Sequence, residues 1–250
     1  IEGIPVEVEV DVAPGIPATR IVGLPDTAVG EARERIRSAI RASGFTWPAR
    51  RITINLAPAD LRKSGGSFDL AIALGILLAS GQIRQRGSAR LAAIGELALD
   101  GRVRGVPGAL PLALPLLSLG HRVLLPTNVA KLPGLSGGEA IPIETLADAA
   151  AAVAGRERLK RLPPIGVETL APSGEVSFEL SAIRGQPIAS RAVLIAACGG
   201  FPILLEGRPG VGKSMLARAL HEILPDLSLE EQSEVAAIAS AGGHAMKDVR

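Results

Sequence analysis

The sequence GRPGVGKS at residues 207–214 matches the pattern G-x-x-x-x-G-K-[ST]. The apolar run FPILL at residues 201–205 precedes it, and apolar residues recur at helical spacing from Met215 to Ile223. A short buried strand, a glycine-rich turn and a helix are therefore predicted in that order. Such a turn directs backbone N–H groups inward around phosphate groups, and the helix dipole adds positive potential. The segment thus predicts a phosphate-binding loop, a P-loop, in an α/β fold.

The composition of this loop predicts binding of a nucleoside triphosphate, and we expect ATP with Mg²⁺. Lys213 would neutralise the β- and γ-phosphate oxygens, and the Ser214 hydroxyl would bind the metal. The alternative is a glycine-rich strand-to-helix turn with an incidental lysine. The residues expected at the nucleotide are Gly207, Arg208, Pro209, Gly210, Val211, Gly212, Lys213, Ser214 and Met215.

Hydrolysis of ATP needs a second acidic motif, an apolar strand ending in Asp-Glu that helps to hold Mg²⁺. The sequence after Ser214 has no segment of that form, since Glu230 and Glu231 follow what reads as a loop or helix start. An arginine finger is also not identified. We therefore expect this chain to bind nucleotide weakly and to turn over little or none, whereas the full-length protein would be an ATPase.

The composition is typical of α/β proteins. The 250 residues suffice for two domains, and 47% are hydrophobic while only 2% are aromatic. Few aromatic residues argue against recognition of single-stranded bases by stacking. The formal charge of +2 is too near neutral to indicate nucleic-acid binding by the chain as a whole. With one cysteine, Cys198, and no apolar run long enough for a membrane span, we expect a cytoplasmic protein.

Periodicity predicts the elements before residue 155. Alternating valines at 6–12 predict a strand, and Asp26 or Thr27 should begin a helix that Gly44 ends. Residues 69–80 are apolar nearly all round and predict a buried helix. The other predicted strands are 52–56, 91–95, 103–105, 122–125 and 141–143, and the other predicted helices are 109–119 and 145–153. A turn at Asp100 and Gly101 should join the strands 91–95 and 103–105.

Prolines and clustered charges then interrupt the pattern, and periodicity returns at Phe178 with a helix near 187–198. We therefore predict a first domain at 1–155, a linker at 156–177 and a P-loop domain at 178–250.

Several further segments resemble the ComM/YifB group of magnesium-chelatase-like AAA+ ATPases. They are IRGQ at 183–186, AACGG at 196–200, LAR at 216–218, ILP at 223–225, VEVEVD at 6–11, IVGLPD at 21–26, NLAPAD at 55–60 and KSGGSFDL at 63–70. These segments extend along nearly the whole chain. The resemblance implies that Ile183 and Gln186 flank the adenine. Arg208 departs from the group, which more often has proline there.

The first domain of this group is similar in fold to the proteolytic domain of Lon, a ribosomal S5 domain 2-like fold. The similarity raises a rival interpretation, a Ser–Lys peptidase with Ser67 as nucleophile. A serine needs a positioned base, and the position of the Lon lysine is occupied here by Leu110. We therefore expect no peptidase activity, and expect Ser67 to cap the helix that begins near Asp69.

The resemblance implies a hexameric DNA translocase that promotes branch migration during DNA uptake and recombination, with ATP between subunits and basic loops in a central pore. Residues proposed to face DNA are Arg33, Arg35, Arg37, Arg62 and Lys63, although solvated helix and loop charges are the alternative. Two other functions stay open. One is a chelatase motor subunit that remodels a metal-inserting partner, and the other is a first domain that serves as a docking module.

Overall fold

The structure is a computed structural model that describes residues 3–63, 65–130, 140–156, 183–225 and 227–242. The chain divides into two compact units. The first unit contains all the strands and the helices α1 to α5 and α8, and the second contains α6 and α7. The predicted linker at 156–177 lies outside the described residues except for Arg156.

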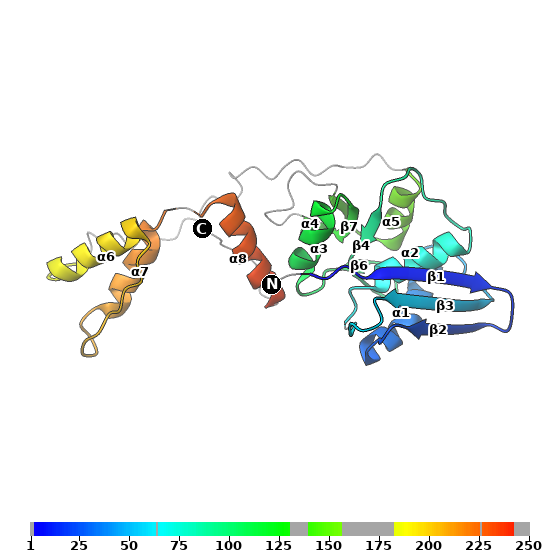
Figure 1. The fold of residues 1–250 in the computed structure, drawn as a ribbon, viewed down its shortest axis with the longest axis horizontal. Coiled ribbons are helices and arrows are strands. Elements are labelled where there is room, and N and C mark those ends of the chain that lie inside the picture. Colours follow the sequence, from blue (N-terminus) through cyan, green and yellow to red (C-terminus); the bar gives the residue numbers. More distant parts are fainter. Residues whose placement is uncertain (1–2, 64, 131–139, 157–182, 226, 243–250) are drawn as a thin grey trace. The chain divides into compact units, whose positions relative to one another are not determined.

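One three-stranded sheet in the first unit has the order β1-β3-β2 (Figure 1). Strand β3 (Arg51–Ala57) pairs antiparallel with β1 (Glu7–Ala13) and parallel with β2 (Ala18–Val22). The period of two predicted for the first strand is confirmed, because its valines are half-buried while Glu7, Glu9 and Asp11 are exposed. Strand β2 was not predicted, since its five residues show no clear alternation.

Helix α1 (Thr27–Ala42) begins and ends where the sequence predicts. The Asp26 carboxylate accepts a hydrogen bond of 2.8 Å from the Val29 amide, which satisfies a donor that the first helical turn leaves unpaired. Beyond Ser43, Gly44 adopts a φ of 82°, a conformation that favours glycine and ends the helix.

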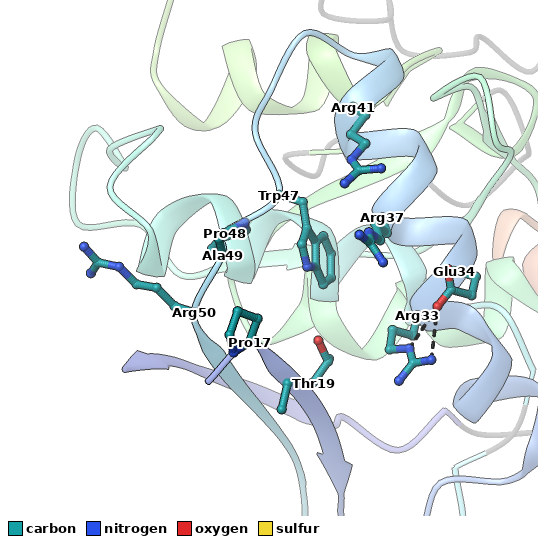
Figure 2. Close-up of a pocket in the computed structure, with 11 residues that line it drawn as sticks. Pro17, Thr19, Arg33, Glu34, Arg37, Arg41, Trp47, Pro48, Ala49 and Arg50 are labelled. Atoms are coloured by element: carbon teal, nitrogen blue, oxygen red, sulfur yellow. Dashed lines mark hydrogen bonds and ion pairs between the residues drawn. The ribbon is translucent and has the colours of Figure 1, made fainter. Parts of the chain in front are cut away.

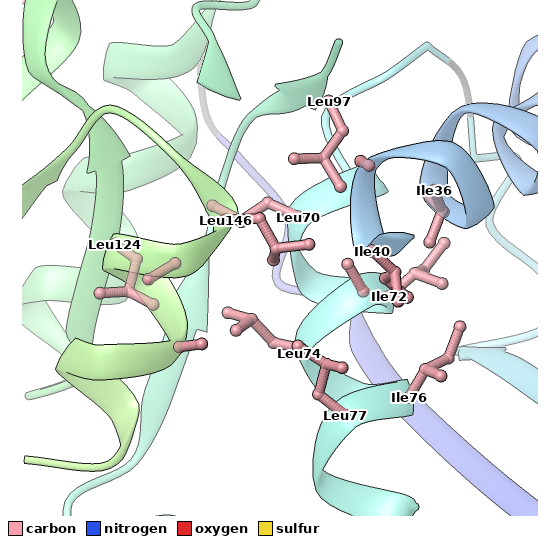
Figure 3. Close-up of a cluster of buried hydrophobic side chains, with 14 of the residues drawn as sticks. Ile36, Ile40, Leu70, Ile72, Leu74, Ile76, Leu77, Leu97, Leu124 and Leu146 are labelled. Carbon is pink, nitrogen blue, oxygen red and sulfur yellow. The ribbon is translucent and has the colours of Figure 1, made fainter. Parts of the chain in front are cut away.

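Helix α2 (Asp69–Ala79) lies at the centre of the main hydrophobic core. Apolar side chains extend from both sides of it, Leu70 and Leu74 toward Leu146 and Ile72 toward Ile40 (Figure 3). The prediction of a helix buried nearly all round is confirmed. This packing places α2 between α1 and the second sheet.

The second sheet is fully parallel, in the order β4-β7-β8. Its strands are β4 (Leu91–Ala93), β7 (Arg122–Pro126) and β8 (Ala140–Ile143). The prediction that residues 91–95 and 103–105 form a hairpin is wrong, because β4 pairs with β7. The Asp100-Gly101 turn instead closes a shorter hairpin of β5 (Glu96–Leu97) and β6 (Val103–Arg104).

Four more helices complete the first unit. They are α3 (Ala109–Ser118), α4 (Thr127–Ala130), α5 (Leu146–Val153) and α8 (Leu229–Ala241). Thr145 and Asp148 form a reciprocal capping box at the start of α5. Helix α8 packs against α3, and the Gly108 amide donates to the Ser240 carbonyl at 2.8 Å. The P-loop domain predicted at 178–250 includes α8, and that boundary stays a prediction.

The second unit pairs α6 (Pro187–Gly199) with α7 (Lys213–Ile223). The strand predicted at 203–205 does not form among the described residues. A strand needs a neighbour for its backbone N–H and C=O groups, and no described segment pairs with these residues. Leu204 is accordingly 88% exposed. No described helix has the length and apolar composition to span a bilayer.

A buried ion pair links α1, α2 and β5 in the first unit. Asp69 is 1% exposed, and its carboxylate accepts hydrogen bonds from Arg35 Nε at 3.0 Å, Arg35 Nη2 at 3.3 Å and the Leu97 amide at 3.3 Å. Burial raises the pKa of the Asp69 carboxyl, and the hydrogen bonds from Arg35 act in the opposite direction. The contact with Asp69 also raises the pKa of Arg35. Arg35 therefore compensates a carboxylate that would be unstable alone in the core.

We predict that Arg35→Met lowers the free energy of unfolding by about 3 kcal/mol at neutral pH, because it leaves a buried carboxylate without its cation. The raised pKa of Asp69 makes the loss smaller at acidic pH, where the carboxyl is protonated, and larger as the pH rises. Urea unfolding of wild type and variant at several pH values measures both effects.

The double variant Arg35→Met/Asp69→Asn serves as the control. The neutral amide oxygen still accepts from Leu97, so the double variant should be more stable than Arg35→Met alone. Equal stability of the two variants across the pH range would show that the buried charge is not what Arg35 compensates.

Candidate nucleotide-binding site

The P-loop lies between α6 and α7 in the second unit. Gly210 has a φ of 86° and Gly212 a φ of 91°, values that residues with a Cβ rarely adopt. A Cβ at either position would meet no atom within 4 Å, so glycine is needed here for backbone conformation and not for space. The glycines thus let the chain turn tightly into α7, and their predicted role of directing backbone N–H groups around phosphates stays a prediction.

Lys213 lies over this loop and not away from it. Its ammonium donates hydrogen bonds of 2.7 Å to the Gly207 carbonyl and 2.8 Å to the Arg208 carbonyl. These contacts use two of the three donors of an ammonium group. The positive charge is therefore held at the loop itself, which is where a phosphate group would need it, and the loop fits a phosphorylated ligand.

The first turn of α7 supplies further groups for an anion. The helix begins at Lys213, and its N-cap residue Gly212 has no side chain to satisfy the first amides. An 11-residue helix directs these N–H groups and the positive end of its dipole at the loop. Ser214 lies exposed in the same turn, so its hydroxyl is accessible to a metal ion beside the phosphates.

Of the predicted residues outside the P-loop, Gln186 is the one for which the structure shows a contact with the loop. Its side-chain amide donates to the Val211 carbonyl at 3.3 Å, and the residue is also the N-cap position of α6. Ile183 is half-buried a short distance before that helix. The side chains of Arg208, Pro209, Val211 and Met215 are exposed.

Lys63 is not an exposed basic residue, and the prediction that it faces DNA is wrong. It is 1% exposed, and its ammonium donates to the Pro58 carbonyl. Its backbone exchanges hydrogen bonds with Leu24 and Asp26, so Lys63 is not a solvated loop charge either and instead joins two loops. Arg35 forms an ion pair with Asp69, whereas Arg62 is exposed.

Ser67 does not cap α2, and that prediction is also wrong. Phe68 is the N-cap residue, already in the right-handed helical region, and the cap has no side-chain hydrogen bond. The backbone of Ser67 is used differently, since its carbonyl accepts from the Gly95 amide at 3.2 Å. This contact ties the start of α2 to the segment between β4 and β5.

Among the described residues, no side chain that could act as a general base is hydrogen-bonded to the Ser67 hydroxyl. Ser67 lines a cavity of about 1110 Å³, and His121 lines the same cavity. His121 Nδ1 lies 3.2 Å from the Leu116 carbonyl, and no described side chain is hydrogen-bonded to the Ser67 hydroxyl. Leu110, at the position expected for a lysine, is fully buried in an apolar cluster.

Comparison with known proteins agrees with this architecture. The sequence model of a family described as subunit ChlI of Mg-chelatase matches residues 8–128, and that of the magnesium chelatase subunit ChlI family matches residues 179–249. The chain therefore belongs to the magnesium-chelatase-like AAA+ proteins, and within them to the ComM/YifB type.

Two curated relatives support the assignment to the ComM/YifB type. The uncharacterized protein YifB of Escherichia coli is 44% identical over 94% of this chain and 46% of its own length. The competence protein ComM of Haemophilus influenzae is 40% identical over 94% of this chain and 47% of its own length. The chain thus spans about half the length of the curated relatives it matches.

We predict that a fluorophosphonate probe does not label Ser67, because no base is placed to remove the hydroxyl proton. Ser67→Ala should change the free energy of unfolding by less than about 0.5 kcal/mol, since the hydroxyl caps no helix. Mass spectrometry after probe treatment, with trypsin as a reactive control, measures the labelling. Stoichiometric labelling that disappears in the alanine variant would restore the peptidase hypothesis.

Proposed function

We propose that this chain binds ATP and Mg²⁺ through residues 207–215 and is part of an ATP-driven AAA+ motor. The observation that carries the proposal is the Lys213 ammonium, held by two loop carbonyls at the start of α7. A glycine-rich turn, a lysine over it and the first amides of a helix are the groups that a triphosphate requires. Membership of the magnesium-chelatase-like proteins supports the same conclusion.

In this proposal, different residues bind the phosphates, the metal ion and the adenine of the nucleotide. Lys213 and the amides of the loop would hold the β- and γ-phosphates, and Ser214 would bind Mg²⁺. Gln186 and Ile183 would flank the adenine, with Gln186 positioned by its contact with Val211. When bound, the nucleotide supplies the phosphoanhydride bond whose hydrolysis drives the motor.

We further propose that the full-length protein is a cytoplasmic homohexamer that moves along DNA during DNA uptake and recombination. The name of the Haemophilus influenzae relative, a competence protein, supports a role of that kind. In this proposal the first domain, residues 1–155, has the Lon-like fold without peptidase chemistry. A linker at 156–177 joins it to the P-loop domain at 178–250.

A chelatase motor subunit is the second candidate function. The description of the matching families as a magnesium chelatase subunit favours it. Such a motor would use the same P-loop to remodel a protein partner that inserts Mg²⁺ into a porphyrin. DNA-stimulated ATP turnover by the full-length protein distinguishes the two, because a chelatase motor should respond to its protein partner and not to DNA.

We predict that ATP or ADP raises the thermal stability of this chain and that Lys213→Ala abolishes most of the increase. Ligand that binds only the native state adds RT ln(1 + [L]/Kd), which is about 2.7 kcal/mol at 100 times Kd. The alanine variant loses the charge that lies over the loop. Differential scanning fluorimetry with millimolar nucleotide and Mg²⁺ measures the shift.

Arg191→Ala is the matched control, because it removes an exposed cation from α6 outside the loop. It should keep the wild-type shift. Equal shifts in wild type and Lys213→Ala would contradict the assignment of the P-loop as the nucleotide site.

A further inference from the structure

A pocket of about 300 Å³ lies in the first unit, between α1, the start of β2 and the segment that leads into β3. Arg33, Arg37 and Arg41 follow one another along the same side of α1, Trp47 lies across from them, and the Arg50 side chain extends away from the helix (Figure 2). The sequence predictions included Arg33 and Arg37 but missed the other three residues. The only available indication was the four-residue spacing, which places the three α1 arginines on one helix face.

The pocket has excess positive charge. The three arginines of α1 line it together with one carboxylate, Glu34. That carboxylate pairs with its neighbour Arg33 at 3.1 Å. Like charges four residues apart on a helix repel each other and destabilise it. Repulsion between these arginines therefore destabilises α1, and a bound anion would relieve that repulsion.

Arg37 provides an independent indication of a ligand. Its Nε atom is buried and has no hydrogen-bond partner among the described residues. A buried donor without a partner destabilises the folded state, and a charged donor does so more strongly than a neutral one. Neither the neighbouring helix nor the facing strand offers an acceptor to this atom. Because the atom is covered, a ligand with several acceptor oxygens would supply one by drawing the Arg37 side chain into the pocket.

The chemistry of the pocket favours phosphate groups. The planar guanidinium binds phosphate through two parallel hydrogen bonds, which makes arginine the preferred residue for this contact. Arg33 and Arg41 are eight residues apart, which is about 12 Å of helix axis at 1.5 Å per residue. One strand of a DNA duplex carries a phosphate about every 3.4 Å of its axis, so a length of this size presents several phosphates.

We propose that this pocket binds the phosphodiester backbone of a nucleic acid strand. The proposal rests on the proposed function, in which DNA is the substrate, and assigns the contact to the α1 face of the first unit. Arg33, Arg37 and Arg41 bind successive phosphates, and Trp47 forms the apolar wall beside them. The contact is independent of base sequence, because no group of the pocket reads a base edge.

The test compares two double variants of the full 250-residue chain. Arg37→Ala/Arg41→Ala removes two pocket cations, whereas Arg84→Ala/Arg104→Ala removes two exposed arginines elsewhere in the same unit. Fluorescence anisotropy with a labelled 30-nucleotide single strand, and with the matching duplex, gives the affinity at several salt concentrations. Circular dichroism and urea unfolding establish that both variants are folded.

We expect the pocket variant to bind the single strand at least about tenfold more weakly than the control variant. The slope of log affinity against log salt should fall by about 1.4, at about 0.7 for each phosphate contact to a single strand. Trp47 is the only tryptophan, so its fluorescence should change when the oligonucleotide binds to wild type and to the control variant. Equal affinities and equal slopes in the two double variants would overturn the proposal.

Other ligands are tested with the same fluorescence. A Trp47 response to millimolar inorganic phosphate without any binding of the oligonucleotide would overturn the proposal in favour of a small-anion site. Binding to vesicles of anionic lipid in place of the oligonucleotide would also overturn it. The nucleotide-induced thermal shift should stay intact in Arg37→Ala/Arg41→Ala, so failure of this inference is distinguishable from failure of the P-loop assignment.

Discussion

The carboxylate of Asp69 sets how three elements of the first unit meet. It accepts from the Arg35 guanidinium on α1 and from the Leu97 amide on β5, and its burial is tolerated only with these donors in place. The contact fixes the rotation of α1 about its own axis, because Arg35 must face inward. Residues two positions away then face the opposite side, which is where Arg33 and Arg37 line the pocket.

The sequence predicted most elements of the first unit because their causes are local. Alternating valines identify β1, the Asp26 side chain identifies the start of α1, and the apolar run at 69–80 identifies a buried helix. Strand pairing was predicted less well. Strand β4 pairs with β7, in a register that places Leu91 opposite Arg122, 31 residues later in the sequence, and it does not pair with the next strand along the chain. Nothing in the short strand itself specifies that partner.

The P-loop and the arginine pocket also differ in how far the sequence alone could predict them. The P-loop is a continuous segment, so its glycines, lysine and serine could be assigned from spacing alone. The burial of Lys63 and the pairing of Arg35 depend on residues distant in sequence, and charge alone gave no means to separate them from Arg37. Trp47 reaches the pocket only because the segment before β3 folds back beside α1.

The two carbonyl contacts of Lys213 have a consequence for ligand affinity. The loop carries its own substitute for a bound anion, because the ammonium is already satisfied by the Gly207 and Arg208 carbonyls. In the proposed site, an arriving phosphate would exchange the acceptors of one side chain and would not require the loop to fold around it. Such a preorganised loop would lose little conformational entropy on binding, which favours affinity.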